Sequence, residues 1–180
     1  MSFKRQLLQA MGSDTLIRIE RSNVEDGSID GYVVALGPKF FLMEVIDDSI
    51  RMDGHYCLRY QDVTDCESPC SRRDFFEKVL RLRGAVRGEK PQVDLSSIEA
   101  IVQTVGTSQP ILTIHPEEAD PGTCYIGEYR GIDGGYLNLL ELTTDGKWSE
   151  ESGKYAVEEI TRVDFGGSYE EALLLVANAG

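Results

Sequence analysis

The 180-residue chain lacks any apolar run long enough to cross a bilayer, and it lacks the motifs of common enzyme classes. It contains no G-x-S-x-G, no P-loop and no G-x-G-x-x-G that opens a helix. Histidine occurs only at His55 and His115, which are too few and too far apart to predict an acid–base pair. These absences predict a protein with no membrane span, no cofactor and no recognisable catalytic centre. A hydrolase or metal enzyme of an unrecognised type remains a minor hypothesis.

Cysteine is scarce, and no secretion signal is expected because Asp14 and Arg18 interrupt the N-terminal apolar residues. The four cysteines are Cys57, Cys66, Cys70 and Cys124. Without a signal peptide they indicate free thiols in a reducing cytoplasm. His55 and the first three cysteines are zinc-ligand types, but C-x₃-C is a less common spacing than C-x₂-C, and the second half lacks all four positions. We therefore predict free thiols, with Cys57 buried in a strand, and no metal.

Positive charge is almost missing from the second half of the chain. Residues 1–90 hold 14 Lys and Arg against 15 Asp and Glu, whereas residues 91–180 hold 4 against 16. The second half alone therefore carries a charge of −12 in a chain whose total is −13. Such a surface repels phosphate backbones within a Debye length of roughly 8–10 Å. The charge argues against general nucleic-acid binding.

What the chain does contain is an internal repeat with a spacing near 93–97 residues. Gly31-x-x-x-x-Leu36-x-x-x-Phe40-Phe41-x-Met43 matches Gly127-x-x-x-x-Ile132-x-x-x-Tyr136-Leu137-x-Leu139 without a gap. Four further matches follow the same order: Leu7-Leu8 with Ile101-Val102, Leu16–Ile19 with Ile111–Ile114, Leu58–Thr64 with Tyr155–Thr161, and Phe76–Leu80 with Tyr169–Leu173. We interpret this order as a tandem duplication.

Each copy has the pattern of a helix followed by short strands and a closing helix. Helical spacing predicts helices over 3–11 and 97–105, with Asp94 and Ser96 as candidate N-caps of the second. Alternating and apolar runs predict strands over 32–36, 40–46, 125–131 and 136–142, and charged loops over 47–54 and 143–153. The predicted fold is mainly β with short helices: two five-stranded barrels that close their edges. The expected domains are residues 1–83 and 96–180, joined by a linker over 84–95 that has two glycines and a proline.

The second copy resembles Sm and Sm-like proteins. The resemblance is carried by Gly127-x-x-x-Gly131-x-Asp133-x-x-Tyr136-Leu137-Asn138-Leu139-x-Glu141, which is similar to the first Sm motif, and by residues 155–165, which are similar to the second. It covers most of both copies as a pattern rather than as identity. The whole chain is also similar to uncharacterised bacterial proteins that carry this barrel in tandem. The resemblance implies two tandem Sm-like, SH3-like barrels, which commonly form rings by pairing edge strands.

In Sm-like proteins the Asp and Asn of the first motif line a uridine pocket together with a basic or polar partner from the second motif. Asp133, Tyr136 and Asn138 match these positions in the second copy, whereas the first copy has Gly37, Phe40 and Leu42. The second motif brings acids where cations would be expected, because the matching stretches are Tyr60–Val63 and Val157–Ile160. Asn138 is therefore predicted to be an outward strand residue, with a ligand contact as the alternative.

Residues 70–90 form a cationic segment in an otherwise acidic chain. Its seven cations are Arg72, Arg73, Lys78, Arg81, Arg83, Arg87 and Lys90, and they face only three acids. Residues 74–83 read as an amphipathic helix, with favourable Asp74–Lys78 and Glu77–Arg81 pairs. One interpretation is a helix packed on its barrel with a solvated basic edge. The other is an electrostatic latch that docks on the acidic barrel of the same chain, on a neighbour, or on an acidic partner.

The sequence thus predicts a cytoplasmic, non-enzymatic interaction or scaffold protein. Its expected partners are a protein or further copies of itself, bound through barrel edges. The alternative is an Sm-like RNA-binding protein that uses the helix 72–83 and the Asp133/Asn138 turn, although the net charge disfavours RNA. The residues considered for ligand or RNA contact are Asp133, Tyr136, Asn138, Arg72, Arg73, Lys78, Arg81 and Arg83.

Overall fold

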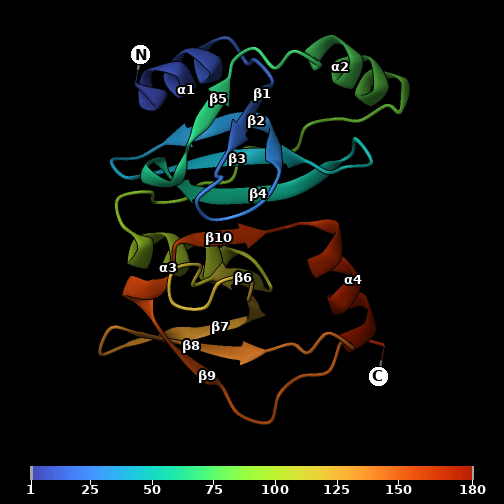
Figure 1. Ribbon diagram of the computed structural model, residues 1–180. Coiled ribbons are helices and arrows are strands. Elements are labelled where there is room, and N and C mark those ends of the chain that lie inside the picture. The colour runs from blue at the N-terminus through green and yellow to red at the C-terminus, as the bar shows by residue number, and fades with distance from the viewer. Residues whose placement is uncertain (1, 180) are drawn as a thin grey trace.

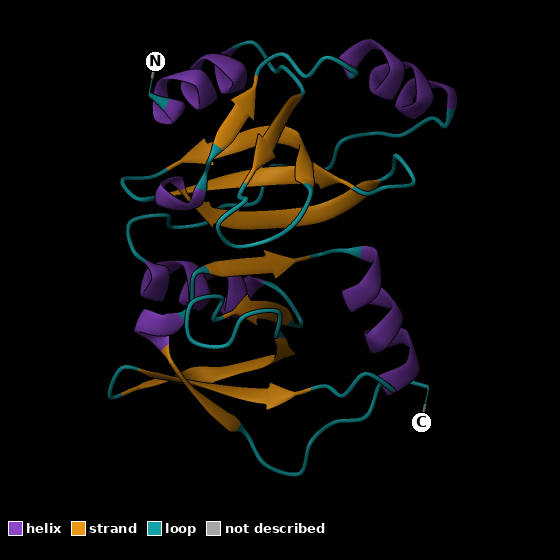
Figure 2. Ribbon diagram, viewed as in Figure 1, coloured by secondary structure: helices purple, strands orange, loops and turns teal. Residues whose placement is uncertain are grey.

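The computed structural model describes residues 2–179, which form four α-helices and one ten-stranded antiparallel sheet (Figures 1 and 2). The first half contains α1 (Phe3–Gly12), β1 (Ile17–Glu20), β2 (Ser28–Leu36), β3 (Phe40–Ile46), β4 (Met52–Arg59), the 3₁₀ turn η1 (Tyr60–Asp62), β5 (Asp65–Glu67) and α2 (Arg73–Leu82). The second contains α3 (Ile98–Ser108), β6 (Leu112–His115), β7 (Tyr125–Asp133), β8 (Tyr136–Glu141), β9 (Gly153–Ala156), η2 (Val157–Glu159), β10 (Arg162–Phe165) and α4 (Ser168–Ala177). The predicted class, mainly β with short helices, is confirmed.

The strands run in the order β5-β1-β2-β3-β4-β10-β6-β7-β8-β9. The first five and the last five strands follow the same internal order, since β5 pairs with β1 in one half and β10 pairs with β6 in the other. The predicted closed barrels are wrong, because the sheet is open. Within neither half does the fourth strand pair with the fifth; instead β4 of the first half pairs with β10 of the second, and the two halves become one sheet.

All residues of strand β3, the fourth strand in the order of the sheet, are buried. Its sequence, Phe-Phe-Leu-Met-Glu-Val-Ile, is apolar on both faces, as expected of a strand covered on two sides. One face carries Phe41 and Met43, which pack in the core of the first half against Leu7 of α1. The other face carries Phe40 and Leu42, which join the core of the second half.

The glycines matched in the repeat have a steric reason in both strands. A β-carbon at Gly31 of β2 would lie 2.2 Å from the carbonyl oxygen of Glu44, and one at Gly127 of β7 would lie 2.3 Å from that of Leu140. Any side chain would therefore push the neighbouring strand away. Both strands bend a few residues further on, where their register with the next strand shifts.

The helices begin and end close to the predicted residues. Ser97 caps α3, since its side chain accepts a hydrogen bond of 3.1 Å from the Ala100 amide. The candidate cap Asp94 instead accepts from the Ser96 amide in the preceding turn. The predicted loop 47–54 is partly wrong, because β4 already begins at Met52.

Residues 84–95, the predicted linker, contain no helix or strand but contact the first half closely. The Arg87 guanidinium lies 4.1 Å from the centre of the Tyr32 ring and donates to Glu44 at 2.6 Å and to Asp14. Leu95 is buried in the core of the second half. The connection is thus fixed at both ends.

Candidate functional site

The predicted ligand residues of the second copy lie around the β7–β8 turn at the far end of the molecule. Asp133 and Tyr136 are register partners that flank Gly134 and Gly135, both of which have positive φ. Tyr136 is 51% exposed. Asn138 is opposite Lys154 of β9, and its amide donates a long hydrogen bond of 3.4 Å to the Gly131 carbonyl. Asn138 is half-buried, and this bond satisfies its side-chain NH₂ group within the β7–β8 strand pair.

A surface pocket of about 470 Å³ lies beside this turn. It is bounded by the start of α3, the β7–β8 turn and η2, and its walls include Ile98, Tyr136 and Val157. Two carboxylates, Glu99 and Glu158, also line it, and no Lys or Arg is among its described lining residues. A pocket with this lining favours a cationic group over a phosphate or a nucleotide.

The predicted basic helix is α2, which packs on the first half through Phe76 and Leu80. Arg72 lies over the rings of Phe75 and Phe76 at 5.3 and 5.1 Å. Arg73 pairs with Asp74 at 3.3 Å and with Glu77 at 3.7 Å, so the expected Asp74–Lys78 and Glu77–Arg81 pairs are replaced by pairs around Arg73. Lys78 and Arg81 are exposed, and Arg83 donates to the backbone carbonyls of Ser49 and Ile50.

The helix does not dock on the second half of its own chain. Among residues 2–179, the ion pairs of α2 stay within the helix. Figure 1 shows α2 at one end of the molecule and the β8–β9 strands at the other. The basic helix and the Asp133/Asn138 turn therefore do not combine into one site, and the packed helix with a solvated basic edge describes the arrangement within one chain.

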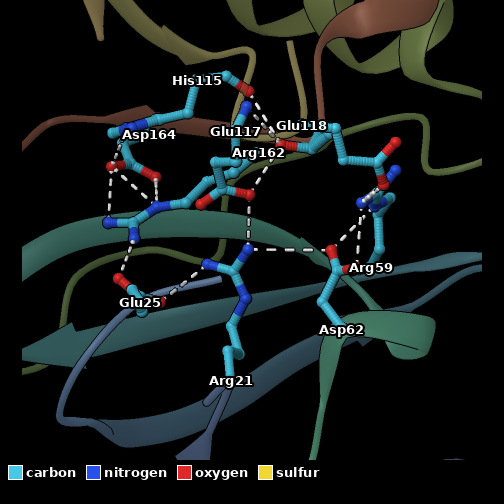
Figure 3. A network of polar contacts seen from close by, with 10 residues as sticks. Arg21, Glu25, Arg59, Asp62, His115, Glu117, Glu118, Arg162 and Asp164 are labelled. Carbon is cyan, nitrogen blue, oxygen red and sulfur yellow. Dashed lines mark hydrogen bonds and ion pairs between the residues drawn. The ribbon is translucent and has the colours of Figure 1, made fainter. Parts of the chain in front are cut away.

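The main polar cluster, which the sequence did not predict, is a network of ion pairs across the junction of the two halves (Figure 3). At its centre is Arg21, whose side chain is fully buried. Its guanidinium pairs with Glu25 at 2.7 Å and Asp62 at 3.7 Å in the first half, and with Glu117 at 2.5 Å in the second. One cation thus bridges carboxylates of both halves.

Two further arginines extend this junction network on either side. Arg59 binds Asp62 at 2.7 Å and reaches across to Glu118 at 2.5 Å. Arg162 of β10 pairs with Asp164 at 2.8 Å and reaches back to Glu25 at 3.0 Å. Its guanidinium also lies 4.0 Å from the centre of the Tyr56 ring on β4. These contacts join the halves beside the β4–β10 backbone pairing.

Asp164 is a buried carboxylate of the junction network. Burial alone would raise its pKa, but the Arg162 guanidinium and the His115 ring, whose Nε2 is 2.8 Å from the carboxylate, outweigh burial and hold the pKa below its usual range. A small pocket of about 170 Å³ adjoins this pair and is also lined by Cys124 and Glu170. Burial, Asp164 and Glu170 raise the pKa of the Cys124 thiol. A thiol with a raised pKa is a poor nucleophile, so this His–Asp–Cys grouping does not favour cysteine catalysis.

The other three cysteines are buried in separate apolar clusters, whereas Cys124 is exposed. Cys57 lies in the core of the second half, Cys66 in the core of the first and Cys70 under α2. Burial raises the pKa of Cys66 to about 11 and that of Cys57 further. Within the described part of the chain, no group of three or more His, Cys, Asp or Glu residues could hold a metal ion.

No local signal in the sequence marks the junction network. Arg21, Glu117 and Arg162 lie in loops or short strands far apart in the sequence, and they meet beside the pairing of β4 with β10. Of the helices in residues 2–179, none has the length and apolarity needed to span a membrane. Comparisons with protein-family models, with curated proteins and with solved structures found no match to the chain.

Proposed function

We propose that the chain is a non-enzymatic interaction module whose two Sm-like halves form one open sheet, and that it associates through the free edges of that sheet. The repeated strand order, the matched glycines of β2 and β7, and the helices before and after each half support this proposal. The observation that carries it is the use of strand edges. The edge strand β4 of the first half pairs with the edge strand β10 of the second. The other edge strands, β5 of the first half and β9 of the second, lie unpaired at the ends of the sheet.

The internal pairing is a template for association between chains. By the repeat, β9 is the counterpart of β4, and β5 is the counterpart of β10. Pairing β9 of one chain with β5 of the next would repeat the β4–β10 contact and give a head-to-tail assembly. The charges at the two edges are complementary, since β9 carries Lys154 whereas β5 carries Asp65 and Glu67.

The residues beside the two strand edges β4 and β9 differ in polarity. This difference determines how strong we expect the association between chains to be. In the first half Phe40, Leu42 and Cys57 are buried at the junction. Their counterparts in the second half are Tyr136, Asn138 and Lys154, which are more polar and only partly buried or exposed. Association through this second face buries less apolar surface, so we expect it to be weaker than the internal contact and sensitive to salt.

Light scattering during gel filtration of the full chain, over rising concentration, tests the proposal. We expect larger species at low salt that dissociate as salt is added. Lys154→Glu removes the cation facing the acidic edge and should abolish these species. Lys147→Glu makes the same charge change at an exposed residue outside β9 and should have no effect. A chain that stays monomeric at every concentration at low salt would contradict association between copies.

RNA binding is the second candidate, because Arg130 on β7, Tyr136 on β8 and Lys154 on β9 place two cations and an aromatic ring on three adjacent strands. The acidic pocket beside them and the charge of the second half oppose it. Titration of the same preparation with oligouridine at low salt separates the candidates. Binding that weakens with salt and is lost in Lys154→Glu would favour RNA, and no binding at low salt removes it.

A further inference from the structure

The two halves can be compared position by position around the pocket that Glu99 and Glu158 line. The 3₁₀ turns η1 and η2 are counterparts: the Tyr60 amide donates to the Lys39 carbonyl at 3.1 Å, and the Val157 amide donates to the Gly135 carbonyl at 2.9 Å. These equivalent backbone bonds hold each turn against the preceding strand pair. The space above η1 in the first half is therefore the counterpart of the pocket above η2 in the second.

In the first half a lysine of the chain itself lies in this space. The Lys4 ammonium donates to the Gly37 carbonyl at 2.9 Å and lies 5.2 Å from the centre of the Tyr60 ring. The Tyr60 hydroxyl donates to the same carbonyl at 3.2 Å. The first half thus shows that an ammonium group is accommodated between the start of the helix, the strand turn and the 3₁₀ turn.

In the second half the corresponding lysine is missing. The helix register that matches Leu7 with Ile101 places Ile98 at the position of Lys4, and the pocket of about 470 Å³ is open. Acids replace its other neighbours: Glu99 stands where the first half has Arg5, and Glu158 stands where it has Gln61. The second pocket therefore lacks the internal cation of the first half and is lined by two carboxylates.

We propose that this pocket binds a lysine side chain of a partner protein, presented on an extended segment that pairs with β9. Glu99 and Glu158 bind the ammonium group, and the exposed ring of Tyr136 covers the methylene chain. This inference rests on the proposed association through a free strand edge, and it places a lysine-bearing segment of another protein on β9 in place of β5 of a second copy.

The position of the pocket selects a protein segment as the source of the lysine. Ala156 is the last residue of β9 and also lines the pocket, so the free strand edge leads directly into it. A segment that adds to β9 gains backbone hydrogen bonds along Gly153–Ala156 and places one side chain at the pocket. Lys154, midway along β9, disfavours a second cation in the segment and selects for a single lysine at the pocket end.

The test uses the full chain and a short fluorescent peptide with one lysine between valines and threonines. Its controls carry acetyl-lysine or norleucine in place of the lysine. Fluorescence anisotropy should detect binding of the lysine peptide, and each control should bind at least about tenfold more weakly, the loss expected when a charge-assisted hydrogen bond is removed. Equal binding of all three peptides, or no binding of the lysine peptide, would overturn the proposal.

Protein variants give a second, independent measure. Glu158→Gln should weaken the lysine peptide by about tenfold and leave the norleucine peptide unchanged. Glu150→Gln, at an exposed acid of the same half outside the pocket, serves as the matched control. Ile98→Lys supplies the cation that the first half has and should abolish binding. Unchanged affinity in Glu158→Gln would overturn the proposal even if Ile98→Lys misfolds.

The outcomes for the pocket and for edge association are distinguishable. Loss of the peptide response with retained, Lys154-dependent association of the full chain would reject the lysine pocket and leave the interaction function standing. Tight binding of free N-acetyl-lysine amide, equal to that of the peptide, would show that β9 pairing is not needed and would also reject the proposal as stated.

Discussion

At the scale of single residues, Arg21 has the most demanding position in the molecule. Its side chain is buried and contacts carboxylates from both halves. A buried charge is tolerated only when it is paired and hydrogen-bonded, because the cost of removing it from water must be offset locally. Removing this one guanidinium leaves Glu117 without a cation, whereas Glu25 keeps Arg162 and Asp62 keeps Arg59.

We predict that Arg21→Ala lowers the free energy of unfolding by about 3–5 kcal/mol, as expected when one partner of a buried ion pair is removed. Arg130→Ala breaks the exposed pair with Glu128 and should cost no more than about 1 kcal/mol. Urea denaturation of both variants measures the difference. Similar midpoints for the two would mean that the junction network adds little to stability.

The depressed pKa of Asp164 makes a prediction about acid stability. Its folded pKa lies below the unfolded value of about 3.9, so its contribution is fully present above that value and is lost as the pH falls below it. Asp164→Asn should therefore flatten the fall in stability between about pH 5 and pH 2. Denaturant midpoints across this range, with Asp133→Asn as the exposed control, provide the measurement. Parallel curves for wild type and Asp164→Asn would contradict it.

At the scale of elements, the local sequence pattern predicts the bounds of helices and strands well, but it does not predict which strands pair. The bounds of β3 follow from its apolar run, and those of α2 and α3 follow from helical spacing to within a few residues. The start of β4 was missed because Met52, Asp53 and Gly54 look like a charged loop. Barrel closure was wrong for a different reason: the pairing of β4 with β10 joins residues about a hundred positions apart, and no local pattern encodes it.

The matched strands β3 and β8 allow a test within one chain. Phe40 is buried at the junction, whereas its counterpart Tyr136 is half exposed at the end of the sheet. Phe40→Ala should lower the free energy of unfolding by about 3–5 kcal/mol, and Tyr136→Ala should change it by no more than about 0.5 kcal/mol. Thermal and urea denaturation give both values. Equal losses would show that the two faces are not as different as their burial indicates.

At the scale of the whole molecule, the sequence shows that charge is distributed unevenly, but it does not show what the charged regions contact. The acidic second half and the basic helix α2 could be recognised from composition, and the structure separates them within one chain. The predicted polar turn at Asp133 and Asn138 lies at a free end, where it borders an acidic pocket. The junction network could not be predicted, since each of its residues acquires a role only when both halves have folded.

The burial of β3 on both faces also imposes an order of events during synthesis. The N-terminal half leaves the ribosome first and can form its own core on one face of β3. The other face of β3 is then an exposed apolar surface until residues 96–180 have been synthesised and cover it. The second half thus matures against a template, and a ribosome that stalls between the halves would leave Phe40 and Leu42 uncovered and prone to aggregation.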